Sequence, residues 1–321
     1  MKKIIAVVVL TALAVIPAAA AGGDYPDKPI RIVVPVAPGG ANDILARTIS
    51  PRLSAEFGQQ VLVENRAGGG GTIGGGHVVK SRPDGYTLAV ASISHVVLAP
   101  IIIPDKPYDP VNDFTPITQL VNQPIVLAAH PSFPARSVKE IVALAKSRPG
   151  ELAYGTPGIG SAMHLAGELL LNRTGARLVH VPYKGGGPAV VNLVSGQVPL
   201  LFVGLAPALP HIRSNRIRAV AVAGAKRAAV LPDAPTIGET LPGYEVNFWV
   251  GVVAPAKTPE AIVGQLNREI VKILNVPEVG NRLQEASFDV VGGTVEQFAK
   301  VIAGDVRRWT PVIKVAGIRP E

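Results

Sequence analysis

The chain has 321 residues, no cysteine and a formal net charge of +8, which is spread thinly along the sequence. The absence of cysteine excludes disulfides, thiolate metal sites and a lipoprotein anchor, while this length can bury the cores of two ordinary domains. Aromatic residues make up only 5% of the chain, too few for the stacking platforms of a single-strand binder, and we expect no nucleic-acid partner.

The amino-terminal segment, residues 1–21, has the pattern of a secretory signal peptide. Two lysines precede an apolar run from Ile4 to Ile16, and small residues of the A-x-A type follow it. The run is shorter than the roughly 20 residues that a membrane-spanning helix needs. We therefore expect cleavage near Ala20 or Ala21 and export to the periplasm.

The first half of the mature chain alternates between strand and helix patterns. The apolar spacing over 43–57 predicts a helix, which Pro51 should kink or split. The glycines of 68–76 predict a loop, followed by a short helix at 76–81. Strands are expected at 30–34, 61–64 and 86–91.

The same alternation recurs after residue 124. Ser137 and Glu140 have the spacing of a capping box at the start of a helix over 137–146. Strands that alternate with helices predict parallel sheets covered on both faces. Further helices are expected at 161–171, from Pro188 onward, at 260–274 and at 295–315, where Pro311 is a point of interruption, and further strands at 125–129, 152–154, 178–181, 198–203, 217–222 and 248–253.

The predicted fold class is α/β with two domains. The final strand and helices make no complete unit of their own, so we expect them to return and pack on the first domain. This arrangement needs two crossovers, near 120–124 and near 244–249. The predicted domains are therefore 22–122 together with 248–321, and 123–247, after the signal peptide.

Three loops share one design: a strand, a glycine-containing turn and a helix N-terminus. They are Pro38–Asp43, Gly155–Ser161 and Tyr183–Pro188. In open α/β sheets such turns lie at the carboxyl ends of strands, where ligands bind, and helix N-termini present unpaired N–H groups. A single loop of this kind is more simply a tight turn. Three of them in two units favour a site for a carboxylate or phosphate.

A fourth glycine segment, Gly69-x-Gly71-x-x-Gly74, matches a dinucleotide fingerprint. No acidic residue ends the next predicted strand, where the ribose hydroxyls would need one. We interpret the segment as a structural or cleft-lining loop with a supporting role, and we expect no cofactor.

The search for catalytic motifs is mostly negative. The sequence has no G-x-S-x-G elbow, no H-E-x-x-H and no P-loop, and its six histidines lack metal-ligand spacing. Ser161 precedes a predicted helix and is better explained as an N-cap than as a nucleophile. We expect neither an enzyme nor a metal site.

Four polar residues near the loops have more than one interpretation. His164, three residues into its helix, could face an anion or cap the turn. His95 has the same two interpretations. Lys184 is either a solvated charge or a counter-charge for the ligand. Asp43 would repel an anion, so we expect it to bind backbone N–H groups and shape its loop.

Several long motifs occur in order along the mature chain. They include Pro35-x-x-Pro38-Gly39-Gly40-x-x-Asp43, Pro83-Asp84-Gly85-Tyr86-Thr87-Leu88, His180-Val181-Pro182-Tyr183-Lys184-Gly185 and Leu231-Pro232-Asp233-x-Pro235-Thr236. This series resembles the Bug family, extracytoplasmic receptors related to tripartite tricarboxylate transporters. The resemblance implies a type II periplasmic-binding-protein fold. It also implies a ligand carboxylate held between the domains by backbone N–H groups, water and small hydroxyl residues.

The residues and the resemblance together define a predicted site. Three residues are expected to shape its loops: Asp43, Lys184 and Gly185. The predicted ligand-binding residues are Pro38, Gly39, Gly40, Ser92, Ser94, His95, Thr156, Gly158, Ile159, Ser161, His164, Tyr183 and Val203.

Two departures from the family pattern bear on the ligand. Ile159 stands where the family often has Asn, and Val203 where it often has Asp. Our hypothesis is a carboxylate with an apolar or aromatic remainder rather than an α-amino acid. The expected partners are this ligand and membrane transporter subunits, with the receptor a monomer. A signalling receptor and a secreted hydrolase are the alternatives.

Overall fold

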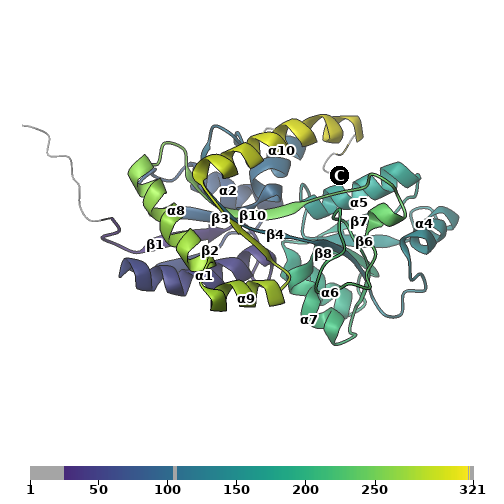
Figure 1. Ribbon diagram of the computed structural model, residues 1–321. Helices are drawn as coiled ribbons and strands as arrows, with labels where there is room; N and C mark the ends of the chain where they lie inside the picture. Colours follow the sequence, from purple (N-terminus) through teal and green to yellow (C-terminus); the bar gives the residue numbers. More distant parts are fainter. Residues whose placement is uncertain (1–24, 104–106, 317, 319–321) are drawn as a thin grey trace, which may run out of the picture.

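Two lobes lie side by side in the computed structural model, which describes residues 25–103, 107–316 and 318 (Figure 1). Each lobe contains one β-sheet with helices packed around it. The predicted signal peptide, residues 1–21, lies outside the described residues. The prediction of an α/β fold with two lobes and two crossovers is confirmed.

The sheet of the first lobe has six strands in the order β11-β4-β10-β3-β1-β2. Strands β1, β2 and β3 are parallel, whereas β10 runs antiparallel to both β3 and β4. The prediction of a purely parallel sheet is therefore wrong, because β10 re-enters from the other lobe and not through a helical crossover. The strands are β1 (Ile30–Val34), β2 (Val61–Asn65), β3 (Thr87–Ser92), β4 (Phe114–Gln123), β10 (Phe248–Pro255) and β11 (Asp289–Gly292).

The sheet of the second lobe has five strands in the order β7-β6-β8-β5-β9. It is also mixed: β5 is antiparallel to both of its neighbours, while β6 is parallel to β7 and β8. Its strands are β5 (Ile125–Ala129), β6 (Ala153–Thr156), β7 (Val179–Pro182), β8 (Leu200–Gly204) and β9 (Arg218–Val222).

The helices follow the predicted order, with several short elements added. The first lobe holds α1 (Ala41–Phe57), η1 (Gly69–Gly71), α2 (Thr72–Val79), η2 (Ser94–Leu98), α3 (Ala99–Ile102), α8 (Glu260–Leu274), α9 (Pro277–Glu285) and α10 (Val295–Ala316). The second holds α4 (Val138–Ser147), α5 (Ala162–Thr174), α6 (Gly186–Val194), α7 (Leu205–Arg213) and η3 (Ile237–Glu239).

Three local predictions need correction. Pro51 does not split α1. The carbonyl that loses its helical N–H donor to the proline belongs to Arg47, and both residues lie on the exposed face of the helix. Pro311 likewise leaves α10 continuous. The capping box of α4 is half formed: Ser137 accepts the N–H of Glu140, but the Glu140 carboxylate accepts the N–H of Arg136.

The glycine segment predicted as a loop over 68–76 is largely helical, because α2 begins at Thr72. Glycine is a poor helix former, so tertiary packing must stabilise this helix. A Cβ on Gly74 would lie 2.8 Å from the backbone of Pro35, and one on Gly75 2.5 Å from the Tyr108 hydroxyl. The glycines therefore let α2 approach its neighbours more closely than any other residue would.

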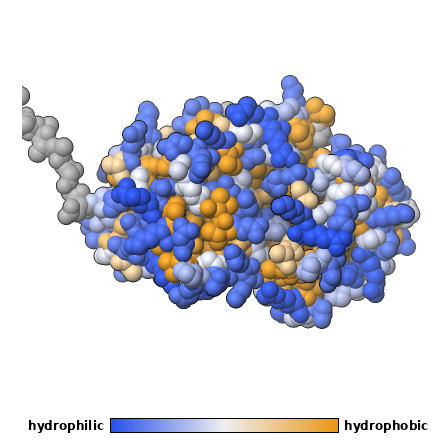
Figure 2. Space-filling model, in the orientation of Figure 1, coloured by the Kyte–Doolittle hydropathy of each residue, from blue (hydrophilic) through white to orange (hydrophobic). Residues whose placement is uncertain are grey.

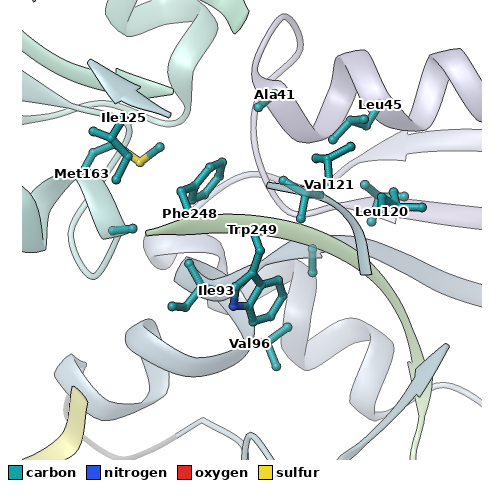
Figure 3. Packing of buried hydrophobic residues seen from close by; sticks show 14 of the residues in the cluster. Ala41, Leu45, Ile93, Val96, Leu120, Val121, Ile125, Met163, Phe248 and Trp249 are labelled. Carbon is teal, nitrogen blue, oxygen red and sulfur yellow. The ribbon is translucent and has the colours of Figure 1, made fainter. Parts of the chain in front are cut away.

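The chain passes between the lobes twice, at Pro124 and between β9 and β10. One cluster of buried side chains continues across these crossovers, from the first sheet to Ile125 and Met163 of the second lobe. Figure 3 shows Phe248, the first residue of β10, between Met163 and the core around Trp249. The same strand thus carries the chain between lobes and forms part of the wall between them.

The outer surface is mostly polar. Figure 2 shows hydrophilic side chains over most of one face, with small apolar patches between them. Across the described residues, every helix is too short or too polar to cross a membrane. Most of the large apolar side chains are gathered in the cores of the two lobes, while a few, such as Ile73 and Val191, are exposed.

The packing of α2 makes a direct stability prediction. Gly75→Ala should lower the free energy of unfolding by about 1–3 kcal/mol, because the new methyl group meets the buried ring of Tyr108. Gly76→Ala is the matched control, since nothing lies within 4 Å of its Cβ position. It should be neutral or stabilising by up to about 1 kcal/mol. Urea unfolding of both variants measures the difference, and equal stabilities would contradict the packing explanation.

Candidate functional site

A cavity of about 410 Å³ lies between the lobes. It is formed where strand ends and helix N-termini of both sheets face each other. The first lobe contributes the turns before α1 and α2 and the start of η2, and the second lobe contributes the turns before α5, α6 and α7. Its wall is lined by Pro35, Val36, Gly40, Ala41, Asn42, Gly68, Gly69, Gly70, Gly71, Ser92, Ser94, His95, Ile103, Pro157, Gly158, Ile159, Ser161, Met163, Pro182, Tyr183, Lys184, Gly186, Val203, Gly204, Pro207 and Phe248.

The two lobes touch around this cavity through hydrogen bonds. The backbone N–H of Ala37 donates to the carbonyl of Lys184 at 2.9 Å. The N–H of Ala162, at the start of α5, donates to the Ser94 hydroxyl at 2.9 Å. Each bond joins one lobe to the other, so the structure represents a closed cleft.

Glycines lie at two places where the backbones of the lobes meet. A Cβ on Gly187 would lie 2.3 Å from the Pro38 carbonyl oxygen, and one on Gly70 would lie 2.3 Å from the Ile159 carbonyl oxygen. Both distances are shorter than any real contact. The lobes therefore approach backbone to backbone, and a side chain at Gly187 would hold them apart.

The turn before α1 is shaped by the Asp43 carboxylate. It accepts the N–H of Gly39 at 3.0 Å and is also bound by the side chains of Arg47 and Asn65. Burial opposes the charged form, but these hydrogen bonds prevail and hold the pKa of Asp43 below its ordinary value. The N–H of Gly39 is therefore not available to a ligand.

Backbone N–H groups in the turn before α5 are likewise hydrogen-bonded within the protein. Gly158 N–H donates to the Thr156 hydroxyl, Gly160 N–H to His164 Nδ1, and His164 N–H to the Ser161 hydroxyl. Ser161 is thus the N-cap of α5, as predicted. With the N–H of Ala162 bound to Ser94, few N–H groups of this turn remain for an anion.

Behind this turn, three aromatic rings form a stack. His164 and His180 lie 4.2 Å apart between ring centroids, and Tyr154 stacks on the other face of His180. Burial lowers the pKa of His164 to about 4, and burial together with His164 lowers that of His180 to about 3. Both imidazoles are neutral near pH 7, so neither supplies a cation. They support the turn from within the second lobe.

His95 reaches the cavity from the first lobe. Its Nδ1 accepts the N–H of Ser92 at 3.3 Å and lies 3.0 Å from the Ser92 hydroxyl. Burial lowers the pKa of His95 to about 4, so this ring is also neutral near pH 7. Lys184, which is exposed, is therefore the one cationic side chain in the cavity wall among the described residues.

The remaining wall is apolar. Ile159 and Val203, the two departures from the family pattern, both line the cavity. Further apolar side chains line the cavity that were not assigned to the site from sequence, since they have the appearance of ordinary core: Val36, Ile103, Met163, Pro207 and Phe248. The one feature that most of these residues share is a position at or next to the end of a helix or strand.

The structure brings most of the predicted site together. The predicted residues in the cavity wall are Gly40, Ser92, Ser94, His95, Gly158, Ile159, Ser161, Tyr183, Lys184 and Val203. Four predicted contacts are not in the wall: Pro38 and Gly39 face Gly187 of the other lobe, while Thr156 and His164 lie behind the α5 turn. Asp43 and Gly185, predicted only to shape their loops, lie outside the wall too. Gly68–Gly71, given a supporting role from sequence, is in the wall.

Comparison with known proteins places this architecture in one family. Residues 45–318 match the Tripartite tricarboxylate transporter family receptor. Protein BugT of Bordetella pertussis is 36% identical over 322 residues, which covers 99% of each chain. An R. palustris protein solved with adipate is 36% identical, with a TM-score of 0.89 over 93% of this chain and 100% of the other. MatC from Rhodopseudomonas palustris, solved with bound malate, is 32% identical, with a TM-score of 0.87 over 90% of this chain and 100% of the other.

Both the length of these matches and the two-lobed fold around one cavity lead to the same conclusion: the chain belongs to the tripartite tricarboxylate transporter receptor family.

Proposed function

We propose that this protein is a periplasmic receptor that captures a small carboxylate between its lobes and delivers it to a tripartite tricarboxylate-type membrane transporter. The observation that carries the proposal is the closed cavity between the lobes, with neutral polar groups at its helix ends and apolar walls. Relatives solved with adipate and malate support a carboxylate as the ligand class.

The donors available to a carboxylate are backbone groups and a few side chains. Three residues in the first turns of α1 and α6 lie in the cavity wall with their N–H groups: Ala41, Asn42 and Gly186. Such groups carry partial positive charge and suit a carboxylate. We expect them, and not the hydrogen-bonded N–H of Gly39, to bind the anion.

The apolar walls favour a ligand with an apolar or aromatic remainder. Val203 and Ile159 offer no partner for an ammonium group, and no acidic side chain lines the cavity among the described residues. A ligand ammonium would lose its water there without gaining a counter-charge, which is costly. The same walls stabilise buried carbon by about 25 cal/mol per Å².

Hinge closure is the proposed mechanism. We assign residues 22–122 and 248–321 to one domain and 123–247 to the other, with the crossovers as the hinge. The division of the strands between the two sheets supports these boundaries. A ligand that contacts both domains only when they meet shifts the population toward the closed form. We propose that the receptor acts as a monomer after cleavage near Ala20 or Ala21.

The alternative from another class is a hydrolase. In that function Ser92 would be the nucleophile and His95 its base. Their side chains are 3.0 Å apart in the cavity wall. A pKa of about 4 makes His95 a weak base at neutral pH, and no carboxylate lining the described cavity orients its ring. The geometry therefore favours binding over acyl transfer. A signalling receptor would bind its ligand in the same way and differ only in its partner.

A thermal-shift screen against mono-, di- and aromatic carboxylates tests the ligand class. A ligand at 100 times its Kd should stabilise the receptor by about 2.7 kcal/mol, which raises the Tm by several degrees. We expect the largest shifts from carboxylates with apolar bodies. Tight binding of aspartate in calorimetry would contradict the apolar-remainder hypothesis, and no shift with any carboxylate would contradict the proposed function.

Gly187→Ala tests closure separately from folding. In α6 the added methyl group improves helix propensity, yet it meets the Pro38 carbonyl only when the lobes close. We expect an unchanged or slightly higher Tm without ligand, and at least a roughly tenfold loss of affinity for the strongest ligand of the screen, about 1.4 kcal/mol.

Gly304→Ala is the matched control for this experiment. It places the same methyl group on a helix glycine, in α10, with nothing within 4 Å. Its affinity should equal that of the wild type. Wild-type affinity in Gly187→Ala would show that ligand binding does not need the closed contact.

A further inference from the structure

His95 is held in one orientation at the cavity wall. It lies in η2, directly after β3, and is 6% exposed. The hydroxyl of Tyr108 donates to its carbonyl, and the neighbouring Ser94 binds the N–H of Ala162 in the other lobe. These bonds fix the backbone that carries the ring, and the contacts of Nδ1 with Ser92 orient the ring itself.

The hydrogen bond to Nδ1 decides where the imidazole proton sits. A backbone N–H can only donate, so the N–H of Ser92 requires a lone pair on Nδ1. Burial lowers the pKa of His95 to about 4, which leaves one proton on the ring near pH 7. We therefore assign that proton to Nε2, a tautomer in which the Ser92 hydroxyl, 3.0 Å from Nδ1, also donates to this nitrogen.

The Nε2 edge of the ring is open toward the cavity. Within the described part of the chain, Nε2 makes no protein hydrogen bond. It is also absent from the set of buried polar atoms without a partner, so it is accessible from the cavity. Gly71, also in the wall, lies beside this edge. A Cβ at Gly71 would lie 2.1 Å from Cδ2 and 3.0 Å from Nε2 and would cover it, but glycine has none. The glycine turn thus leaves this edge uncovered.

We propose that His95 determines ligand specificity in the first lobe by donating its Nε2–H to a carboxylate oxygen of the ligand. The inference rests on the proposed function, since it concerns the same cavity. The donor is neutral and fixed in place, so it stabilises an acceptor without adding a positive charge to an apolar cavity. It rejects a ligand that presents only a hydrogen-bond donor, such as an amine, at this position.

The tautomer can be tested without any ligand. In protein labelled with ¹⁵N-histidine, two-bond ¹H–¹⁵N correlation spectra at pH 7 distinguish the Nε2–H form, the Nδ1–H form and the imidazolium. We expect His95 in the Nε2–H form, assigned by loss of its signals in His95→Gln. Either of the other two forms would overturn the inference.

Affinity measurements test the contact itself, with benzoate and adipate as separate probes in calorimetry. His95→Leu removes the donor and keeps an apolar side chain, and we expect Kd to rise roughly 10- to 100-fold, as for a hydrogen bond to a charged group. His95→Gln restores an N–H donor and should recover affinity to within about fivefold of the wild type. A purely structural role would show no such rescue.

The outcomes separate the two proposals. If the wild type binds a probe and His95→Leu binds it equally well, the inference fails and the proposed function stands. If the wild type binds neither probe nor any carboxylate of the thermal-shift screen, the proposed function fails and the inference fails with it. Melting temperatures of both variants identify any loss of folding. In that case the Nε2–H signal of wild-type His95 carries the test: a bound probe should shift it, and a bound probe that leaves it unmoved would overturn the inference.

Discussion

Contact between two bare stretches of backbone is the constraint on which the cavity depends. Where the lobes meet, Gly187 lies against the Pro38 carbonyl and Gly70 against that of Ile159, at separations that leave no space for a Cβ. Only glycine allows such an approach, and the bond from Ala37 to Lys184 then forms beside it. Glycine in these turns therefore has a different role from the one its sequence pattern suggests. It makes the two surfaces fit, and the wall of the cavity follows from that fit.

The same constraint explains how an anion can be held without a buried cation. Each of the turns before α1 and α5 binds an N–H group within its own lobe: Asp43 accepts that of Gly39, and Ser161 accepts that of His164. These bonds lie within one lobe and do not depend on closure, so they order the turns before a ligand arrives, which lowers the entropic cost of binding. The donors that remain are neutral and fixed, and closure excludes water around them. An empty closed cleft would leave those donors without partners, so the closed form becomes favourable only when a ligand supplies acceptors to both lobes.

Periodicity in the sequence was sufficient for the order of the elements and for the two crossovers. Apolar runs such as Ile30–Val34 and Ile125–Ala129 are buried strands at the predicted positions. Periodicity did not predict β4, because Pro116 and several polar residues break the pattern of a buried strand. In the structure β4 nevertheless pairs on both sides. The start of helix α2 at Thr72, four residues before the predicted helix, was not predicted either, because contacts with Tyr108 and Pro35 outweigh the poor propensity of its glycines. For the site, the loops were found, but not which N–H groups are free. That depends on partners such as Ser94, which is 68 residues from Ala162.

Capture and selection are consequently assigned to different parts of the cavity. We propose that backbone groups at helix ends, with His95, recognise the carboxylate that ligands of this class share, at positions that depend on the glycine contacts. Ile159, Val203 and Phe248 line the same cavity and would face the remainder of the ligand. A polar group placed against Val203 would lose its water without a replacement, at a cost of about 1–3 kcal/mol, which is roughly a 5- to 150-fold loss of affinity. An apolar group at the same place is stabilised by its burial. One exchange in the wall can therefore redirect the receptor to another carboxylate, while the contacts that close the lobes stay unchanged.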